Sequence, residues 1–257
     1  EGSFYFVNPK RDTVFGHTCY PNLDAIEDDI DLVIVCTPQK TVLPILKESL
    51  RKKAQAAVVF ASGYSEVGNE QGKEAENELL AFCEENAYSV MGPNCAGFIN
   101  YIDRVSSFAF ISENRDRTGS VGFISQSGQL VLSTMDRPGT GFSYVISAGN
   151  ANAVTMEAYL DFLVEDDQTR VIALYIEGIK NPAAFVQALD KASKKGKPVV
   201  ILKVGKSAKA QAIAASHTGS MSGSDAVLSA VLKKYGAIRV DDLEELISTS
   251  QALSILP

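Results

Sequence analysis

Short runs of β-branched residues alternate with helical patterns along the whole of this 257-residue chain. The alternation is most regular in the second half, where each apolar run is bounded by glycine, proline or polar residues. Such a rhythm is typical of parallel sheets covered by helices on both faces. The expected strands are 120–124, 142–146, 171–176, 198–202 and 237–240, and the expected helices are 128–136, 153–164, 182–194, 223–234 and 242–254. The second half therefore predicts a doubly wound, flavodoxin-like α/β domain.

The first half repeats this rhythm with less regular spacing. The expected strands are 4–7, 32–36, 57–60 and 89–91, and the expected helices lie near 40–53 and 70–86. The loop Gly92-Pro-Asn-Cys-Ala-Gly97 interrupts the pattern, and a weakly patterned stretch follows it. The total length suits two α/β units of about 100 to 150 residues each. We expect an N-terminal domain over 1–115 and a second domain over 116–257, joined between about Asn100 and Ser120.

Charge and apolar patterning exclude several classes of protein. The formal net charge is −7, and the basic residues are scattered, so a nucleic-acid-binding surface is not expected. No apolar run approaches the roughly 18 to 20 residues that span a bilayer. The beginning of the sequence shows no secretory leader pattern. Four widely spaced cysteines contain no Cys-x-x-Cys pair, which predicts reduced thiols, a cytoplasmic location and no metal site.

Two standard phosphate-binding motifs fail in this sequence. Gly205-Lys-Ser207 follows an expected strand, but the glycine that a Walker loop requires would fall at Val200. Gly139-Thr-Gly141 is followed by Tyr144, where a dinucleotide fingerprint requires glycine. The expected strands nevertheless end in small or polar residues, and ligands of open α/β sheets bind at that edge. The sequences at these strand ends are Ser125-Gln-Ser-Gly128, Ser147-Ala-Gly-Asn150, Glu177-Gly178 and Val204-Gly-Lys-Ser207.

The turn Ser125–Gly128 leads from a strand directly into a helix. Backbone N–H groups at such a helix start favour an anion, which makes Ser127 and Gly128 candidate phosphate-binding residues. Serine is also a common helix-capping residue, so an ordinary capped turn is an equal alternative on this stretch alone.

His217, one of two histidines, stands in a run of small residues, Ala214-Ala-Ser-His-Thr-Gly-Ser220, before an expected helix. A neutral imidazole attacks phosphorus without first losing a proton, so a phosphorylated His217 is one hypothesis. Glu177, on the same predicted sheet edge, is a candidate to hold the other ring nitrogen. The alternatives are an exposed loop histidine and a solvated loop carboxylate.

The residues from His217 to Asp225, together with Tyr235-Gly-Ala-Ile-Arg-Val240, resemble the phosphohistidine segment of nucleoside-diphosphate-forming acyl-CoA synthetases. That superfamily includes succinyl-CoA synthetase and ADP-forming acetyl-CoA synthetases. The first half resembles the Rossmann-like CoA-binding domain of the same family. The motifs there are Val7-Asn-Pro-Lys10, Cys36-Thr-Pro38, Ala61-Ser-Gly-Tyr64 and Gly92-Pro-Asn-Cys-Ala-Gly97.

The resemblance implies an acid–thiol ligase that joins a small carboxylic acid to CoA at the expense of ATP or GTP. It implies that His217 carries the phosphoryl group, that Glu177 holds His217, and that Ser127 and Gly128 receive the phosphoryl group. The residues that it assigns to the CoA site are Lys10, Thr37, Pro38, Ser62, Gly63 and Asn94. ADP or GDP with Mg²⁺ would be held mainly by an ATP-grasp subunit or fused domain, within a hetero- or homo-oligomer.

A CoA-binding domain of this family opens with a strand and a glycine-rich turn, and neither precedes the run at Phe4. The resemblance therefore implies that the central strand and its turn are missing from the start of this sequence, and that a nucleotide-grasping domain comes from a partner subunit or from a continuation beyond Pro257. The same domains also occur fused to protein acetyltransferases as catalytically inactive modules. A CoA-binding regulatory or scaffold module is the alternative function, although the histidine is commonly lost there.

Overall fold

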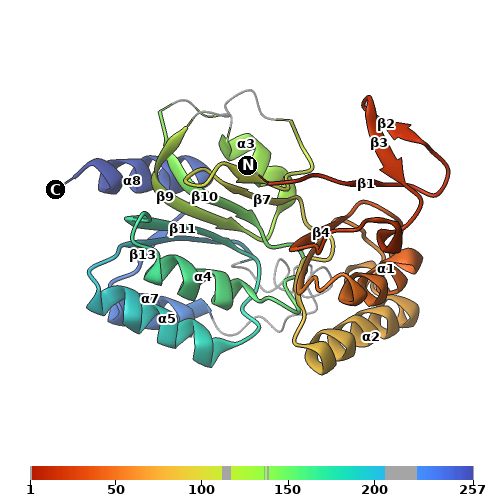
Figure 1. The fold of residues 1–257 in the computed structure, drawn as a ribbon. Helices are drawn as coiled ribbons and strands as arrows, with labels where there is room; N and C mark the ends of the chain where they lie inside the picture. Colours follow the sequence, from red (N-terminus) through yellow and green to blue (C-terminus); the bar gives the residue numbers. More distant parts are fainter. Residues whose placement is uncertain (1, 112–116, 136, 138, 206–224, 257) are drawn as a thin grey trace.

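The structure is a computed structural model, and it describes residues 2–111, 117–135, 137, 139–205 and 225–256. A seven-stranded sheet forms its larger part, in the order β13-β12-β11-β9-β10-β7-β8 (Figure 1). The strands from β13 to β10 are all parallel; at one edge β7 runs antiparallel to β10, and β8 runs antiparallel to β7. The strands are β7 (Gly97–Asn100), β8 (Val105–Ser106), β9 (Thr118–Ser125), β10 (Phe142–Ser147), β11 (Val171–Ile176), β12 (Val199–Lys203) and β13 (Ile238–Val240).

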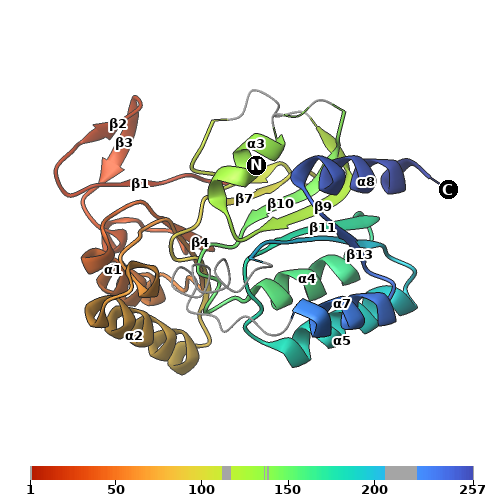
Figure 2. The same ribbon diagram turned by 180° about the vertical axis from the view of Figure 1, so that it is seen from behind.

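Helices cover both faces of this sheet. Figures 1 and 2 show α3 (Gly128–Met135) and α8 (Leu243–Ile255) on one face. The opposite face carries α4 (Met156–Glu165), α5 (Pro182–Lys194) and α7 (Asp225–Lys234). The double cover confirms the flavodoxin-like, doubly wound fold predicted for the second half.

The sheet has a core on each side because side chains alternate along a strand. On β9, Phe123 belongs to the buried cluster that contains Val131 of α3, whereas the next residue, Ile124, belongs to the cluster that contains Leu160 of α4. Both β9 side chains are fully buried. A continuous apolar run without polar alternation is therefore what this central strand requires.

A smaller parallel sheet contains β4 (Leu32–Val35), β5 (Ala56–Val59) and β6 (Ser89–Met91) in that order. Helices α1 (Gln39–Arg51) and α2 (Glu70–Asn86) pack on it. The buried positions Val42 and Leu46 of α1 and Leu79 and Phe82 of α2 share one cluster with the strands. The helical spacing of these apolar residues explains why both helices were predictable from the sequence.

A third sheet has the order β1-β3-β2 and contains β1 (Phe6–Val7), β2 (Thr13–Val14) and β3 (His17–Tyr20). The predicted strand 4–7 is present in part as β1, but it pairs with β3 rather than with β4. The sequence did not predict the β2–β3 hairpin, because these short strands mix polar and apolar residues without the continuous apolar run of a buried strand. In the described structure, β4 stands at the edge of its sheet.

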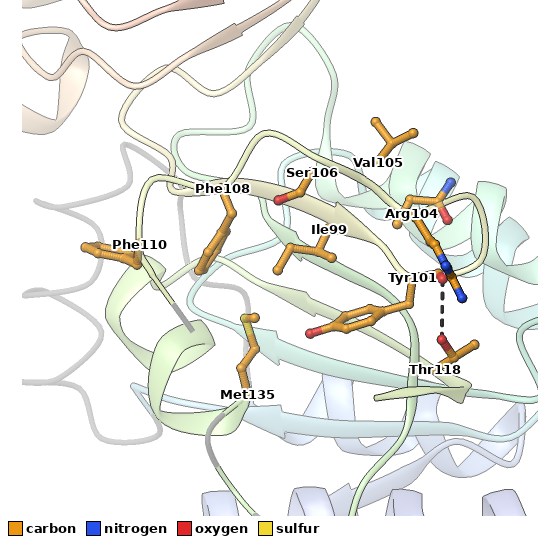
Figure 3. Close-up of a pocket in the computed structure, with 10 residues that line it drawn as sticks. Ile99, Tyr101, Arg104, Val105, Ser106, Phe108, Phe110, Thr118 and Met135 are labelled. Carbon is orange, nitrogen blue, oxygen red and sulfur yellow. Dashed lines mark hydrogen bonds between the residues drawn. The ribbon is translucent and has the colours of Figure 1, made fainter. Parts of the chain in front are cut away.

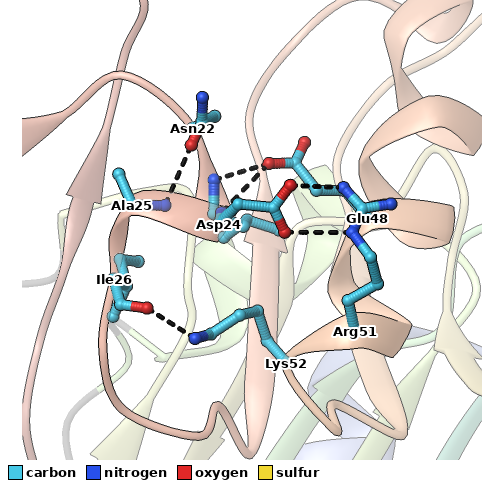
Figure 4. Close-up of polar contacts among 8 residues, drawn as sticks. Asn22, Asp24, Ala25, Ile26, Glu48, Arg51 and Lys52 are labelled. Carbon is cyan, nitrogen blue, oxygen red and sulfur yellow. Dashed lines mark hydrogen bonds and ion pairs between the residues drawn. The ribbon is translucent and has the colours of Figure 1, made fainter.

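Polar contacts join the segment before β4 to α1 (Figure 4). Glu48 of α1 accepts hydrogen bonds from the N–H groups of Leu23, at 2.7 Å, and Asp24, at 3.3 Å. The Arg51 guanidinium donates two bonds to the Asp24 carboxylate, at 3.0 and 2.6 Å. These side chains hold the 3₁₀ helix η1 (Leu23–Ala25) against α1.

Strands β7 and β8 fall within the stretch assigned to the first domain by the sequence, yet they extend the large sheet. Gly97–Asn100 pairs with Tyr144–Ser147 of β10. The sheet of the second half thus takes in residues well before 116, and the place where the two domains separate stays a prediction. Among the described helices, none has the length and apolar character needed to cross a bilayer.

Candidate functional site

The loops that follow β4, β5 and β6 lie at one edge of the small sheet, because the three strands are parallel. Thr37 and Pro38 follow β4, Ser62 and Gly63 follow β5, and Asn94 follows β6. The side chains of Thr37, Ser62 and Asn94 are exposed there. The structure thus brings together five of the six residues predicted for the CoA site.

These loops are in direct contact with one another. The Asn94 N–H donates to the Ala61 carbonyl at 2.9 Å. Gly63 has a φ of +110°, and a Cβ added there would lie 3.4 Å from the Cβ of Gln39, in the first turn of α1. Glycine adopts this backbone conformation without strain, so the loop can pass close to the start of α1.

Lys10, the sixth residue predicted for the CoA site, lies outside this cluster of loops. It follows β1, in the sheet with β3, and its side chain is exposed. Its backbone N–H donates to Asn8 Oδ1 at 2.9 Å, a local turn contact. Its role at the CoA site stays a prediction.

A second group of predicted residues meets at the carboxyl edge of the large sheet. Gln126 is the link between them. Its Oε1 accepts from the N–H groups of Glu177, at 2.5 Å, and Gly178, at 3.0 Å, and its Nε2 donates to the Gly178 carbonyl at 3.1 Å. Gln126 thereby fastens the turn after β11 to the turn that holds Ser127 and Gly128.

The two predicted phosphate-binding residues differ in their backbone contacts. Ser125 Oγ accepts from the Ser127 N–H at 3.0 Å, so that donor is already engaged in the described structure. Gly128 is the first residue of α3, and the first N–H groups of a helix have no intrahelical partner. Gly128 therefore offers the better-placed donor of the two, at the positive end of the helix dipole.

Lys203, at the end of β12, is a buried charge at the same edge. It is 7% exposed, and its Nζ donates to the Glu177 carbonyl at 2.9 Å and to the Val204 carbonyl. Burial lowers the pKa of Lys203 below its ordinary value of 10.5, while the charges of Asp225 and Glu177 oppose the shift. The lysine holds the Glu177 turn from the side opposite Gln126.

Burial also raises the pKa of Tyr175 to about 12, and the Glu177 charge adds to the shift. The Tyr175 hydroxyl therefore stays protonated beside the carboxylate throughout the physiological range. A carboxylate beside an un-ionised tyrosine can accept a hydrogen bond from an imidazole N–H, which is the role predicted for Glu177.

His217 lies outside the described residues, within 206–224. The chain enters this stretch from β12 beside Glu177, since the Val204 N–H donates to the Ile176 carbonyl at 3.1 Å. It returns at Asp225, whose carboxylate accepts a 2.6 Å hydrogen bond from Arg239. The role of His217 stays a prediction.

The sequence singled out neither Gln126 nor Lys203 as functional. Gln126 lies within the Ser125–Gly128 turn, but the sequence does not indicate a partner for its side-chain amide. Lys203 follows the apolar run 198–202 and gave no signal of its own, because a lysine at a strand end usually reaches solvent. A charged residue that directly continues a buried parallel strand is the pattern that would have drawn attention to it.

Figure 3 shows a pocket of about 650 Å³ elsewhere on the large sheet, between the β7–β8 hairpin and α3. Tyr101, Phe108, Phe110 and Met135 supply much of its wall. Among the described residues, none of those predicted for the site lines this pocket. The described part of the chain also holds no cluster of His, Cys, Asp and Glu side chains suited to a metal ion.

Both halves of the chain match known protein families. Residues 118–253 match the family described as the succinyl-CoA ligase like flavodoxin domain. Residues 1–101 match a CoA binding domain. The chain belongs to the nucleoside-diphosphate-forming acyl-CoA synthetase family. The resemblance noted in the sequence is thus confirmed, and so are the two fold types.

Individual relatives of this acyl-CoA synthetase chain agree with the family. A trans-feruloyl-CoA synthase from an unknown prokaryotic organism is 39% identical, over 95% of this chain and 35% of the relative. The alpha subunit of an ADP-forming acetate–CoA ligase II from Pyrococcus furiosus is 34% identical, over 98% of this chain and 55% of the subunit. The chain spans between about a third and about half of the length of these relatives.

A solved structure of similar fold comes from Candidatus Korarchaeum cryptofilum. It is a dinucleotide-forming acetyl-coenzyme A synthetase 1 in complex with phosphate and ADP. Its TM-score to this chain is 0.89 at 32% identity, covering 98% of this chain and 54% of that chain.

Proposed function

We propose that this chain is the CoA-binding and phosphoryl-carrying part of an acyl-CoA ligase that forms ADP or GDP. The observation that carries the proposal is the bridge made by Gln126, because it joins the predicted histidine-holding Glu177 to the predicted phosphate-binding turn at Ser127–Gly128. Relatives named as ADP-forming acetate–CoA ligases support the same reaction class.

In the proposed reaction, a ring nitrogen of His217 takes the terminal phosphoryl group of ATP or GTP, and the nucleoside diphosphate leaves. Glu177 accepts the hydrogen bond of the other ring nitrogen and stabilises the positive charge that develops on the ring. The helix start at Gly128 then receives the phosphoryl oxygens with its N–H group and the positive end of the helix dipole. The phosphoryl group passes from His217 to the carboxylate substrate and makes an acyl phosphate.

The loops at the small sheet fit a phosphate-bearing ligand such as CoA. Thr37 and Ser62 carry exposed hydroxyl groups at this edge, Thr37 just before the start of α1 and Ser62 beside Gly63. Bound CoA supplies the thiol that accepts the acyl group as phosphate leaves. The hydroxyl groups of Thr37 and Ser62 would hold its phosphates, and Lys10 would add a positive charge.

The nucleotide and Mg²⁺ belong in this proposal to an ATP-grasp domain, in a partner subunit or in a longer polypeptide. The relatives include both an alpha subunit and longer chains of which this chain covers just over a third. We also propose a cytoplasmic, oligomeric enzyme, in agreement with the reduced cysteines expected from the sequence.

The decisive experiment labels the full-length protein, together with its nucleotide-binding part, with γ-³²P-ATP. We expect an acid-labile, base-stable label, as phosphohistidine gives. His217→Ala should lose the label and at least about 10⁴-fold of the turnover, because the proposed reaction passes the phosphoryl group through this histidine. CoA affinity should change by less than about twofold, because CoA binds at the other edge. Full turnover by His217→Ala would refute the phosphohistidine role, and CoA binding without any turnover in the wild type would favour the regulatory module.

A further inference from the structure

The two edges of the site meet at a residue to which neither the sequence nor the proposed reaction gives a role. Asn150 lies in the loop after β10, between the CoA-side loops and the turn after β11. Gly149, just before it, has a φ of +60°, and a Cβ there would lie 2.5 Å from the Pro93 carbonyl oxygen. The loop is thus packed directly against the loop that carries Asn94, at a distance that only glycine allows.

The Asn150 side chain faces the CoA-side loops. Its Nδ2 donates to Glu66 Oε2 at 2.6 Å and lies 3.3 Å from Glu76 Oε2, while its Oδ1 accepts from Asn94 Nδ2 at 3.3 Å. Glu66 in turn uses Oε1 to accept from the N–H groups of Gly63, at 2.6 Å, and Tyr64, at 3.2 Å. A single carboxylate therefore connects Asn150 to the backbone of the loop predicted to hold CoA.

The Asn150 backbone contacts both the loop after β6 and the segment after β11. Its N–H donates to the Pro93 carbonyl at 2.9 Å, and its carbonyl accepts from Lys180 Nζ at 2.5 Å. The Lys180 N–H donates to Oε1 of the buried Glu157 at 2.9 Å, which fixes the chain three residues after Glu177. Every polar group of Asn150 is used, and the partners come from both sides of the site.

We propose that Asn150 is a positioning residue that sets the CoA-side loop at Ser62–Gly63 in register with the phosphoryl-transfer turn at Glu177. The inference rests on the proposed acyl-CoA ligase reaction, in which an acyl phosphate made at one edge must meet CoA held at the other. Hydrogen bonds from a nearly planar amide to two carboxylates fix the loop in orientation as well as in distance. Misalignment at the acyl transfer step costs rate even when both half-sites remain intact.

Asn150→Asp tests this bridge, because it keeps the size and the Oδ1 acceptor but turns the donor to Glu66 and Glu76 into a like charge. In the full-length enzyme we expect the KM for CoA to rise about tenfold and the kcat for acyl-CoA formation to fall about tenfold, as lost charge-assisted hydrogen bonds produce. The rate of His217 phosphorylation by ATP alone should stay within about twofold, because that half-reaction uses the other edge. A merely structural role would slow both reactions together.

A compensating pair gives a second, independent test. In Glu66→Gln alone, the new NH₂ group of the glutamine faces the NH₂ group of Asn150, so two donors meet. In the double variant Glu66→Gln with Asn150→Asp, the glutamine NH₂ group donates to the new aspartate carboxylate, and a donor again faces an acceptor. The glutamine Oε1 still accepts from the Gly63 N–H. We therefore expect the double variant to have a KM for CoA closer to that of the wild type than either single variant has. A double variant no better than Asn150→Asp would overturn the proposal.

Hydrogen exchange separates this inference from the proposed function. The amides of Gly63 and Tyr64 should exchange at least about tenfold faster in Asn150→Asp, and the double variant should restore them. Asn86→Asp at the far end of α2, where the side chain donates to the Phe82 carbonyl, is the matched control and should change neither exchange nor KM. If the wild type neither binds CoA nor is labelled, the proposed function fails, and the exchange result still decides the bridge. Unchanged exchange with an unchanged KM in Asn150→Asp would refute it.

Discussion

The carboxyl edges of the two parallel sheets are built differently. At the small sheet, the predicted CoA residues Thr37, Ser62 and Asn94 are exposed at the ends of short loops. At the large sheet, the turn with Glu177 is held by Gln126 on one side and by the buried Lys203 on the other. The contrast agrees with the proposed roles, in which the small-sheet edge binds CoA through accessible groups and the large-sheet edge transfers a phosphoryl group through groups held in place before reaction.

If the contrast is right, the largest effect short of removing His217 should come from the Gln126 bridge. Gln126→Leu keeps the volume but removes the partners of the Glu177 and Gly178 N–H groups. We expect phosphorylation of His217 to slow by about 10²-fold, because small displacements at a reacting group have effects of this size. Single-turnover labelling measures the rate, and the CoA Kd from calorimetry should stay within about twofold.

A Gln126→Leu variant that phosphorylates at the wild-type rate would show that the Glu177 turn needs no side-chain support. Gln129→Leu provides the matched control, since this exposed side chain lies three residues further along, at the second position of α3. It should leave the rate unchanged.

Lys203→Met should reduce stability as well as rate. The variant leaves the Glu177 and Val204 carbonyls without a charged donor, which should lower the free energy of unfolding by about 1 to 3 kcal/mol. Chemical denaturation measures this, with the exposed Lys233→Met as control. An unchanged midpoint in Lys203→Met would mean that this edge is no better supported than the CoA edge.

Lys203→Met also allows the pH dependence of stability to be tested. Burial lowers the pKa of Lys203 in the native protein, so the native state binds the lysine proton less tightly than the unfolded chain does. The unfolded chain therefore holds more protons in the window from the lowered pKa up to the ordinary value of 10.5. As the pH rises through that window, the wild type should gain stability relative to Lys203→Met. A stability difference that shrinks with rising pH would contradict the lowered pKa.

The CoA edge should respond more weakly to any single change. Ser62→Ala removes one exposed hydroxyl, and we expect a loss of about three- to tenfold in CoA affinity, as one hydrogen bond to a phosphate gives. The melting temperature should not move measurably, since no described contact of the fold depends on this side chain. Calorimetry and thermal unfolding together test the expectation, and a large loss of stability would place Ser62 among the supporting residues instead.

The smallest effect lies away from both edges. Glu165, at the end of α4, is held by Lys191 and Lys195 of the neighbouring helix and its following turn, and these bonds lower its pKa to about 2. Stability from this group is present above the ordinary carboxyl pKa and is lost as the pH falls from about 4.5 towards 2. The wild type and Glu165→Gln should therefore converge in stability over that window. Because the side chains are exposed, the difference at neutral pH should be small.

Much of the chain's regular structure was predictable. The sequence predicted helices over 70–86 and 182–194 and strands over 89–91 and 171–176, and the structure has each at those residues. Long apolar periodicity and clear capping signals, such as Asn69 before α2 and Asn181 before α5, make these elements locally determined. The β2–β3 hairpin lacked both signals.

Amino-acid order along the chain thus fixes where helices and strands form and which loops reach the edges of the sheets, because those features depend on neighbours a few residues apart. Packing in three dimensions, in contrast, adds β7 to the large sheet and brings Gln126 to Glu177. It also places Asn150 against Glu66. Gln126 and Glu177 are 51 residues apart in the sequence, and Asn150 and Glu66 are 84 residues apart. A single polar side chain has no periodic pattern from which such a distant partner could be predicted. The contact of Gln126 with Glu177 exists only once β9 and β11 pair in the large sheet, and that of Asn150 with Glu66 only once the small sheet packs beside the large one.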